Sequence, residues 1–295
     1  MIKPDFSQPV PDDLGVIHFI GIGGSGMSGI ARILIGMGHR VTGSDLRDTD
    51  NVAALRELGA EIFIGHDESH LGNPDTVVVT SALWPTNPEY LLAKKLGIPV
   101  IHRSQALAYL TSKNRVVAVA GAHGKTTSTG MIITALLKLG VDPSFVNGGV
   151  IASLNSSSAK GDSDLFIIEA DESDGSFIEY NPFAAIVTNI EHDHVDFFAT
   201  PEAVAQAFRD FAATIQPGGF LTYCADDAGA VALADSISST DLVSYGVSEN
   251  ANLHIDQIEL LTMGSTARAI WNGKSVGHIE LQVPGHHNLL NAAGV

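Results

Sequence analysis

Residues 16–38 read VIHFIGIGGSGMSGIARILIGMG, an apolar run that ends in a glycine-rich turn and continues into a helical pattern. The turn GIGGSG (21–26) satisfies G-x-G-x-x-G between a predicted strand and a predicted helix, and Asp45 ends the next predicted strand. Glycines let the backbone approach an anion, and a helix N-terminus favours negative charge. The motif predicts a nucleotide diphosphate site, but NAD, another nucleotide and a tight turn without a ligand all remain open.

The pattern around this turn alternates strands and helices up to about residue 112. Strands are predicted at 16–22, 39–45 and 75–83, with helical segments between them. This alternation is typical of a doubly wound parallel sheet, so we predict a Rossmann-like α/β domain over residues 1–112.

A second strand, loop and helix start at residue 114 with NRVVAVAGAHGKTTSTGMIITALLKLG. GAHGKTT (121–127) has the Gly-Lys-Thr core of a P-loop, although its first glycine comes earlier than G-x-x-x-x-G-K-[ST] requires. Backbone amides would still surround phosphates, Lys125 would meet their oxygens and the Thr126 hydroxyl would suit Mg²⁺. We predict a P-loop α/β ATP-binding domain over residues 113–295.

The rest of this domain is predicted to end in an antiparallel β addition. Residues 249–283 alternate in polarity, and WNGK within them is a hairpin signal. NSSS (155–158) is predicted to be a short polar loop. PGHHNLLNAAGV begins a helix with nothing after it to pack against, so we expect the chain to be part of a longer protein.

Acidic and amide side chains follow two predicted strands of the second domain. Glu169 and Asp171 end the strand at 164–171, and the polar run that starts at Asn189, NIEHDHVD, comes at the end of the strand at 184–190. Ligands collect where parallel strands end, and Mg²⁺ prefers oxygen ligands. A zinc pair of His192 and His194 lacks further cysteine or histidine ligands, so magnesium is favoured.

The composition limits the partners of the chain. It has 33 acidic and 16 basic residues and therefore a formal charge of -17. This net negative charge argues against binding nucleic acid or an anionic membrane through the overall electrostatic field of the protein. The single cysteine, Cys224, cannot form an internal disulfide and is expected to be a small buried residue. No signal peptide or membrane span is predicted, so a cytoplasmic location is expected.

Together these motifs resemble the Mur ligase family of ATP-dependent amide-forming enzymes. The matching pieces are IGIGGSGMSGIA, GSD, VVVTSAL, IPVIHRSQAL, GAHGKTT, EADESD, TNIEHDHVD and PGHHNLLNA. The resemblance implies that ATP phosphorylates the carboxylate of UDP-N-acetylmuramic acid and that L-alanine attacks the acyl phosphate. GIGGSGMSGIA and EADESDGSF favour this L-alanine-adding branch, and the branch that recycles muropeptides is the alternative. The family's third domain is expected after residue 295, so this part alone is expected to be inactive.

The resemblance also implies roles for residues of the second domain. Thr126 and Glu169 would hold one magnesium and His194 a second, and Lys125, Glu169 and His194 would act at the reacting phosphate. The side chains of Asn288 and Asn291 would meet the adenine, with His287 beside them. The ATP phosphates would lie against Gly121, Ala122, His123, Gly124, Lys125, Thr126 and Thr127.

In the first domain the resemblance places the UDP part of the substrate. The resemblance places Gly23, Ser25, Gly26, Met27 and Ser28 at the diphosphate. It places Asp45, Ser81 and Arg103 near the uridine or sugar, and a ribose contact as in a dehydrogenase is the alternative for Asp45. Three other functions remain open: an NAD-dependent oxidoreductase built on the first loop, a non-catalytic UDP-sugar-binding module, and a simple P-loop hydrolase. The oxidoreductase leaves the second loop unexplained. The sequence leaves homodimer formation open.

Overall fold

The structure, a computed structural model, describes residue 2, residues 9–193 and residues 197–295. It contains two compact units, and each is described by itself. Unit 1 comprises Met1–Lys113 and Ser144–Asp162, and unit 2 comprises Asn114–Pro143 and Ser163–Val295.

Unit 1 is built on a five-stranded parallel sheet. Its order is β3-β2-β1-β4-β5, with Ile17 of β1 in register with both Val41 and Thr76. The direction of the connections reverses between β1 and β4, which makes a crevice at the ends of these strands. The predicted parallel α/β fold is confirmed. The strands are β1 Ile17–Ile20, β2 Val41–Asp45, β3 Glu61–Ile64, β4 Thr76–Val79 and β5 Val100–His102.

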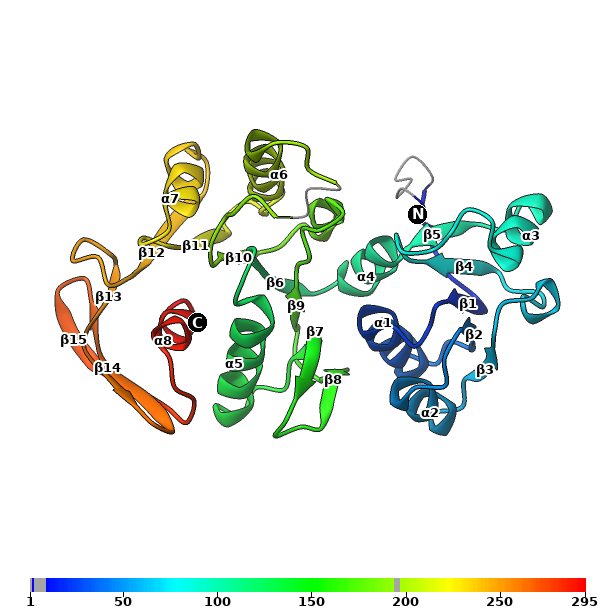
Figure 1. The fold of residues 1–295 in the computed structure, drawn as a ribbon, viewed down its shortest axis with the longest axis horizontal. Helices are drawn as coiled ribbons and strands as arrows, with labels where there is room; N and C mark the ends of the chain where they lie inside the picture. The colour runs from blue at the N-terminus through cyan, green and yellow to red at the C-terminus, as the bar shows by residue number, and fades with distance from the viewer. Residues whose placement is uncertain (1, 3–8, 194–196) are drawn as a thin grey trace. The chain divides into compact units, whose positions relative to one another are not determined.

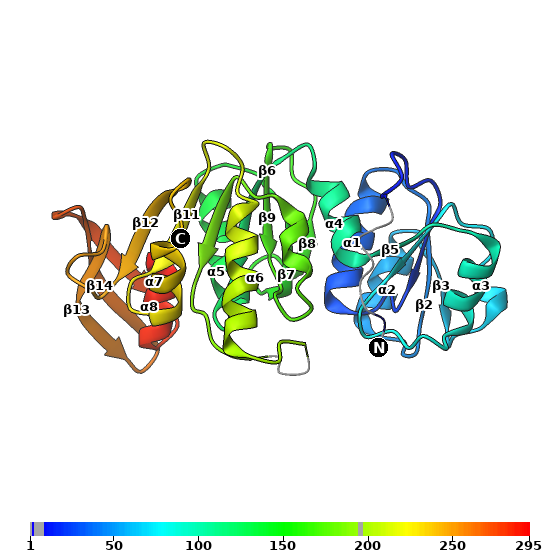
Figure 2. The same cartoon turned by 90° about the horizontal axis from the view of Figure 1, so that it is seen from above.

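Helices cover both faces of this sheet. Figure 2 shows α1 (Ser25–Gly36), α2 (Asp50–Glu57) and α4 (Arg103–Thr111) on one face and α3 (Pro88–Leu96) on the other. The face changes with the direction of the crossovers, as right-handed connections require. A short 3-10 helix, η1 (Glu68–His70), packs with α3.

A hairpin from later in the chain completes unit 1. Strand β7 (Ser144–Ile151) pairs antiparallel with β8 (Ser156–Ala159), and both pack on α1. The predicted loop at 155–158 is therefore wrong, because β8 takes its register from β7 rather than from apolar alternation. Gly29 of α1 permits the close approach, since a Cβ there would lie 3.3 Å from Val146 Cγ1.

Unit 2 contains parallel strands followed by an antiparallel extension. Within the unit the order is β15-β14-β13-β12-β11-β10-β6-β9, and β13, β14 and β15 pair antiparallel. Asn272 and Gly273 turn the last hairpin with φ of 47° and 80°, as WNGK predicted. The strands are β6 Arg115–Ala120, β9 Leu165–Glu169, β10 Ala184–Val187, β11 Phe220–Cys224, β12 Asp241–Gly246, β13 Leu253–Leu261, β14 Gly264–Trp271 and β15 Lys274–Leu281.

Four helices flank this sheet in pairs. Figure 1 shows α5 (Lys125–Lys138) with α8 (His286–Ala293) on one face, and α6 (Pro201–Ala213) with α7 (Ala228–Asp235) on the other. Aromatic packing fixes α6, because Phe208 and Phe211 contact Phe177 of the 3-10 helix η2 (Ser176–Tyr180). No helix in the described ranges is long and apolar enough to cross a membrane.

The packing of β2 predicts a difference between two glycines. A Cβ on Gly43 would lie 2.8 Å from Phe19 O, whereas Gly36, at the end of α1, has open space around it. We expect Gly43→Ala to lower the free energy of unfolding by about 1–3 kcal/mol through overpacking. Gly36→Ala is the matched control and should be neutral or stabilise by up to about 1 kcal/mol. Urea unfolding followed by circular dichroism measures both, and equal stabilities would contradict this account of the sheet.

Candidate nucleotide-binding sites

The two glycine loops lead into helices whose first turns lack side-chain caps. Helix α1 begins after Gly24 and α5 after Gly124, and neither has an acidic residue in its first turn. Helix α8, after Gly285, is also uncapped. Uncapped first-turn amides can donate to an anion. The other α-helices in the described ranges are capped by the side chains of Thr49, Asn87, His102, Thr200 and Asp227.

The first loop is held by the end of strand β2. The amides of Gly21 and Ile22 donate to Ser44 O at 2.8 and 3.0 Å, and that of Gly23 donates to Asp45 Oδ2 at 2.8 Å. Asp45, predicted to lie near the uridine or sugar, therefore supports the loop. It also lines the hollow described below.

Of the residues predicted to bind UDP, Arg103 lies against the start of α1, and Ser81 contacts His102, the residue before Arg103. A Cβ on Gly26 would lie 3.3 Å from Arg103 Nη1, and Ser81 Oγ lies 2.9 Å from His102 Nε2. Ser25 is exposed beside them, whereas the Met27 and Ser28 side chains are buried. Ser28 uses both donors inside the helix, its hydroxyl to Ser25 O and its amide to Gly24 O.

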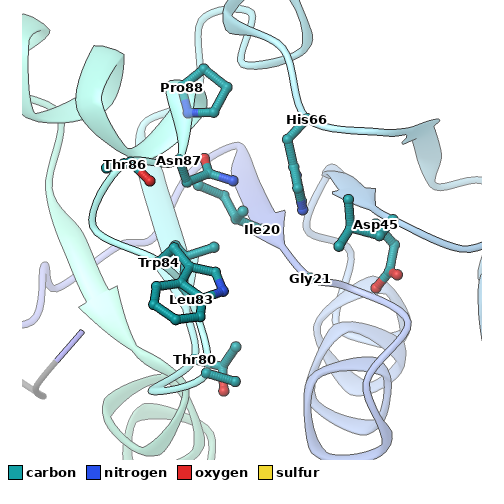
Figure 3. Close-up of a pocket in the computed structure, with 12 residues that line it drawn as sticks. Ile20, Gly21, Asp45, His66, Thr80, Leu83, Trp84, Thr86, Asn87 and Pro88 are labelled. Carbon is teal, nitrogen blue, oxygen red and sulfur yellow. The ribbon is translucent and has the colours of Figure 1, made fainter. Parts of the chain in front are cut away.

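A hollow of about 450 Å³ opens at the ends of β1, β2 and β4 (Figure 3). Its walls are largely apolar, and a few polar side chains face it, as is usual for small-molecule sites. This is the crevice expected where the strand order reverses. The lining residues are Ile20, Gly21, Asp45, Leu46, His66, Thr80, Ala82, Leu83, Trp84, Thr86, Asn87 and Pro88.

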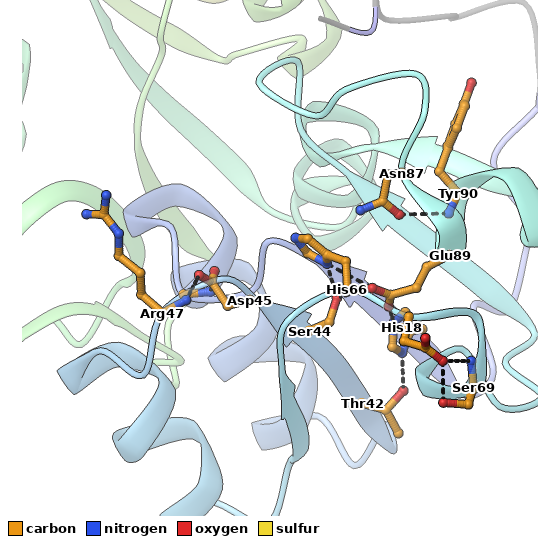
Figure 4. Close-up of polar contacts among 12 residues, drawn as sticks. His18, Thr42, Ser44, Asp45, Arg47, His66, Ser69, Asn87, Glu89 and Tyr90 are labelled. Carbon is orange, nitrogen blue, oxygen red and sulfur yellow. Dashed lines mark hydrogen bonds and ion pairs between the residues drawn. The ribbon is translucent and has the colours of Figure 1, made fainter.

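A buried carboxylate lies behind one wall of this hollow (Figure 4). Glu89 is fully buried, and its oxygens lie 2.7 Å from His18 Nε2, 2.8 Å from His66 Nδ1 and 2.8 Å from Ser44 Oγ. Burial alone raises the pKa of Glu89, but the hydrogen bonds from His18, His66 and Ser44 outweigh it and lower the pKa to about 2. Glu89 is therefore ionised at neutral pH.

In the second loop the Lys125 ammonium bridges the loop and the segment after β9. Its Nζ donates to Gly121 O at 2.7 Å and to Glu172 Oε1 at 2.9 Å. Both side chains are largely buried, with 13% of Lys125 and 4% of Glu172 exposed. Burial raises the pKa of Glu172, although Lys125 opposes this shift.

The loop backbone is held by the end of β10. Asn189 Oδ1 accepts from the His123 amide at 2.8 Å, and Asn189 Nδ2 donates to His123 O at 3.0 Å. Thr188 Oγ1 donates to the same carbonyl at 2.6 Å. A side chain on Gly121 would collide with Thr188 Oγ1, so glycine is required there. Ala122 is fixed as well, through its amide to Asn189 O at 3.2 Å.

Two oxygen groups suited to Mg²⁺ meet beside the loop. Thr126 Oγ1 donates to Glu169 Oε1 at 3.0 Å, and a hydroxyl with a carboxylate is a donor set that fits this ion. The neighbouring Thr127 is exposed. His194, predicted to hold a second magnesium, lies outside the described residues. The described part of the chain contains no cluster of three histidine, cysteine or acidic side chains arranged to hold a metal.

Helix α8 approaches the second glycine loop through Asn291, one of the residues predicted to contact the adenine. A Cβ on Gly124 would lie 2.5 Å from Asn291 Oδ1, and Asn291 is buried. The side-chain Nδ2 of Asn288 instead donates to Pro284 O at 2.8 Å, and the His287 ring lies next to Gly285.

Comparison with known proteins identifies the family. Residues 16–115 match the catalytic domain of the Mur ligase family, and residues 119–295 match the Mur ligase middle domain. The chain belongs to the Mur ligase family. A UDP-N-acetylmuramate–L-alanine ligase of Clavibacter michiganensis is 53% identical over 294 residues, which are 100% of this chain and 61% of that protein. The chain thus spans less than two thirds of that relative's length.

Solved structures of Mur ligases share this fold. A UDP-N-acetylmuramate-alanine ligase from Thermotoga maritima superposes with a TM-score of 0.85 at 31% sequence identity. The matched region covers 95% of this chain and 63% of the Thermotoga chain. A UDP-N-acetylmuramate:L-alanyl-gamma-D-glutamyl-meso-diaminopimelate ligase from Neisseria meningitides superposes with a TM-score of 0.88 at 27% sequence identity. The matched region covers 96% of this chain and 92% of the Neisseria chain.

Glu172, Asn189 and Glu89 are among the residues at these sites that were not predicted from sequence. Glu172 follows Glu169 within EADESD, a run of acids in which no single member stands out. Asn189 was noted only as part of a polar run. Glu89 stands in the first turn of α3, where an acidic residue is ordinary.

The Lys125–Glu172 pair predicts how stability depends on pH in a variant of this Mur ligase. Lys125→Met leaves Glu172 buried without its cation, so the pKa of Glu172 should rise further above its ordinary value of 4.5. A carboxyl group with a raised pKa loses its stabilising contribution as pH increases through that pKa. The deficit against wild type should be small near pH 4.5 and reach about 1–3 kcal/mol at pH 7–8.

Urea unfolding at a series of pH values measures this deficit. Lys125→Met/Glu172→Gln is the control, because residue 172 then has no carboxyl group to titrate and the deficit should stay nearly constant with pH. The same pH dependence in the single and double variants would contradict the interpretation.

Proposed function

We propose that this chain is the UDP-sugar-binding and ATP-binding part of an enzyme that joins L-alanine to the carboxylate of UDP-N-acetylmuramic acid with ATP. The reaction belongs to cytoplasmic synthesis of peptidoglycan precursors. The observation that carries the proposal is the pair of glycine loops followed by uncapped helices, one in each unit. Two such helix starts suit a reaction between two phosphate-bearing substrates. The name of the Clavibacter relative supports the choice of substrates.

The first loop is proposed to bind the diphosphate of the UDP-sugar. The first-turn amides of α1 at Ser25, Gly26 and Met27 would donate to its oxygens, and the Arg103 guanidinium beside Gly26 would supply the charge. The hollow at the strand ends would then receive the nucleoside. Residues 1–112 remain our proposal for the corresponding domain.

The second loop is proposed to bind ATP. The Lys125 ammonium would release its hydrogen bond to Glu172 and donate to the phosphate oxygens instead. The first-turn amides of α5 would donate to the same phosphate group. Thr126 and Glu169 would hold Mg²⁺, which when bound neutralises phosphate charge. Asn291 would contact the adenine side of the nucleotide. His194 is proposed as a ligand of a second magnesium.

The chemistry explains why ATP is needed. A carboxylate resists attack by an amine, because its negative charge repels the nucleophile and it lacks a leaving group. Transfer of phosphate from ATP gives an acyl phosphate, and the L-alanine amine then displaces phosphate to form the amide. The protein contributes mainly positioning and charge neutralisation.

A second candidate is the ligase that recycles muropeptides. It is favoured by one observation, the TM-score of 0.88 to the Neisseria enzyme. The 53% identity to the Clavibacter L-alanine ligase, against 27% to the recycling enzyme, favours the L-alanine reaction.

Ligand titration of the 295-residue chain tests the proposal. We expect UDP-N-acetylmuramic acid to bind in calorimetry and NADH not to bind. Arg103→Ala should weaken UDP-sugar binding about tenfold, and Lys125→Ala should weaken MgATP binding by a similar factor, since each removes one charged hydrogen bond. Each variant should leave the other ligand's affinity unchanged. Binding of NADH without binding of the UDP-sugar would overturn the ligase assignment.

A further inference from the structure

The peptide group between His123 and Gly124 lies in the second loop, and its carbonyl faces the residues that follow strand β10. Thr188 Oγ1 donates to His123 O at 2.6 Å, and Asn189 Nδ2 donates to the same oxygen at 3.0 Å. In a trans peptide group the C=O and N–H bonds point in opposite directions. The Gly124 N–H therefore points away from β10, and within the described ranges no acceptor is hydrogen-bonded to it. This N–H is available to an anion.

A glycine at position 124 permits two orientations of this peptide group. The φ of Gly124 is 86°, in the left-handed region that favours glycine. Turning the peptide group over would give Gly124 a negative φ, as in the change from a type II to a type I turn. His123 O, rather than the Gly124 N–H, would then face the anion and repel it. Contacts outside Gly124 must therefore select the orientation that binds.

Lys125 does not make this selection, because it contacts the other carbonyls of the loop. Its Nζ lies 2.7 Å from Gly121 O and 3.4 Å from Ala122 O. In the described part of the chain, the donors to His123 O are the side chains of Thr188 and Asn189. The direction of this carbonyl thus depends on two side chains at the end of β10.

Both of these side chains are held in position. Thr188 is buried. Asn189 Oδ1 accepts the His123 N–H at 2.8 Å, so the amide nitrogen of Asn189 must face the carbonyl of the same residue. The amide of Ile190 donates to Asp227 Oδ1 at 3.1 Å, outside the loop. The segment that carries the two donors is therefore anchored independently of the loop that it contacts.

We propose that Thr188 and Asn189 are positioning residues that hold the His123–Gly124 peptide group with its N–H toward the phosphates of the nucleotide. They set the fraction of molecules in which the loop can bind. This inference rests on the proposed function, because it takes the ligand of the second loop to be ATP.

Two double variants that differ in one hydroxyl test this role by calorimetry with MgATP. Thr188→Val/Asn189→Ala removes both donors, and the apparent Kd rises as the fraction of binding-competent molecules falls, so we expect binding at least about tenfold weaker than wild type. Thr188→Ser/Asn189→Ala restores the hydroxyl and should bind within about threefold of wild type. Both variants should bind UDP-N-acetylmuramic acid like wild type, since that site lies in unit 1.

NMR of the wild-type chain keeps the test independent of variant folding. The pair His-Gly occurs only at 123–124, so ¹³C-carbonyl histidine with ¹⁵N-glycine gives one signal from this peptide group. The Gly124 proton should move downfield when MgATP is added, because it then donates to a charged oxygen.

Two results would overturn the inference and leave the proposed function intact. One is equal affinity of the two double variants for MgATP, and the other is an unchanged Gly124 signal in a wild-type chain that binds MgATP. Failure of the wild-type chain to bind MgATP would overturn both.

Discussion

Parallel strands deliver their following residues to a single edge of the sheet, and this constraint organises both units. In unit 1 the ends of the five strands supply the first glycine loop, Asp45, His66, Ser81 and Arg103. In unit 2 the ends of β6, β9 and β10 supply the P-loop, the Glu169–Glu172 segment and Asn189. Residues far apart in sequence therefore meet without long loops, and each site rests on rigid strands.

Two buried carboxylates show how local contacts decide charge in a protein of formal charge -17. Glu89 receives hydrogen bonds from two imidazoles and a hydroxyl, and its pKa falls to about 2 despite full burial. Glu172 accepts a hydrogen bond from the Lys125 ammonium, and burial still raises its pKa. For Glu172 the effect of burial exceeds that of the Lys125 contact, whereas for Glu89 the hydrogen bonds from His18, His66 and Ser44 exceed the effect of burial. The phosphate binding that we propose for such an acidic chain would likewise depend on local amides and a few cations.

The sequence revealed features that depend on local backbone rules. The glycine loops, the strand–helix alternation and the WNGK hairpin each follow from φ requirements or from periodicity. Strand β8 was missed because its serines carry no apolar alternation, and its pairing with β7 supplies the order. Glu89 and Glu172 could not be predicted as partners of His66 and Lys125, because these contacts join different strands and helices. The roles of the site residues, His194 included, remain predictions.

The hairpin of β7 and β8 has a consequence for synthesis on the ribosome. Unit 1 closes over α1 only when residues up to 162 are available, long after its five sheet strands have been made. By then the P-loop and α5 of unit 2 have already been translated. The buried face of α1, which includes Gly29, therefore waits uncovered while another unit begins to form. The order of translation thus ties the folding of the two units together, although each has its own core.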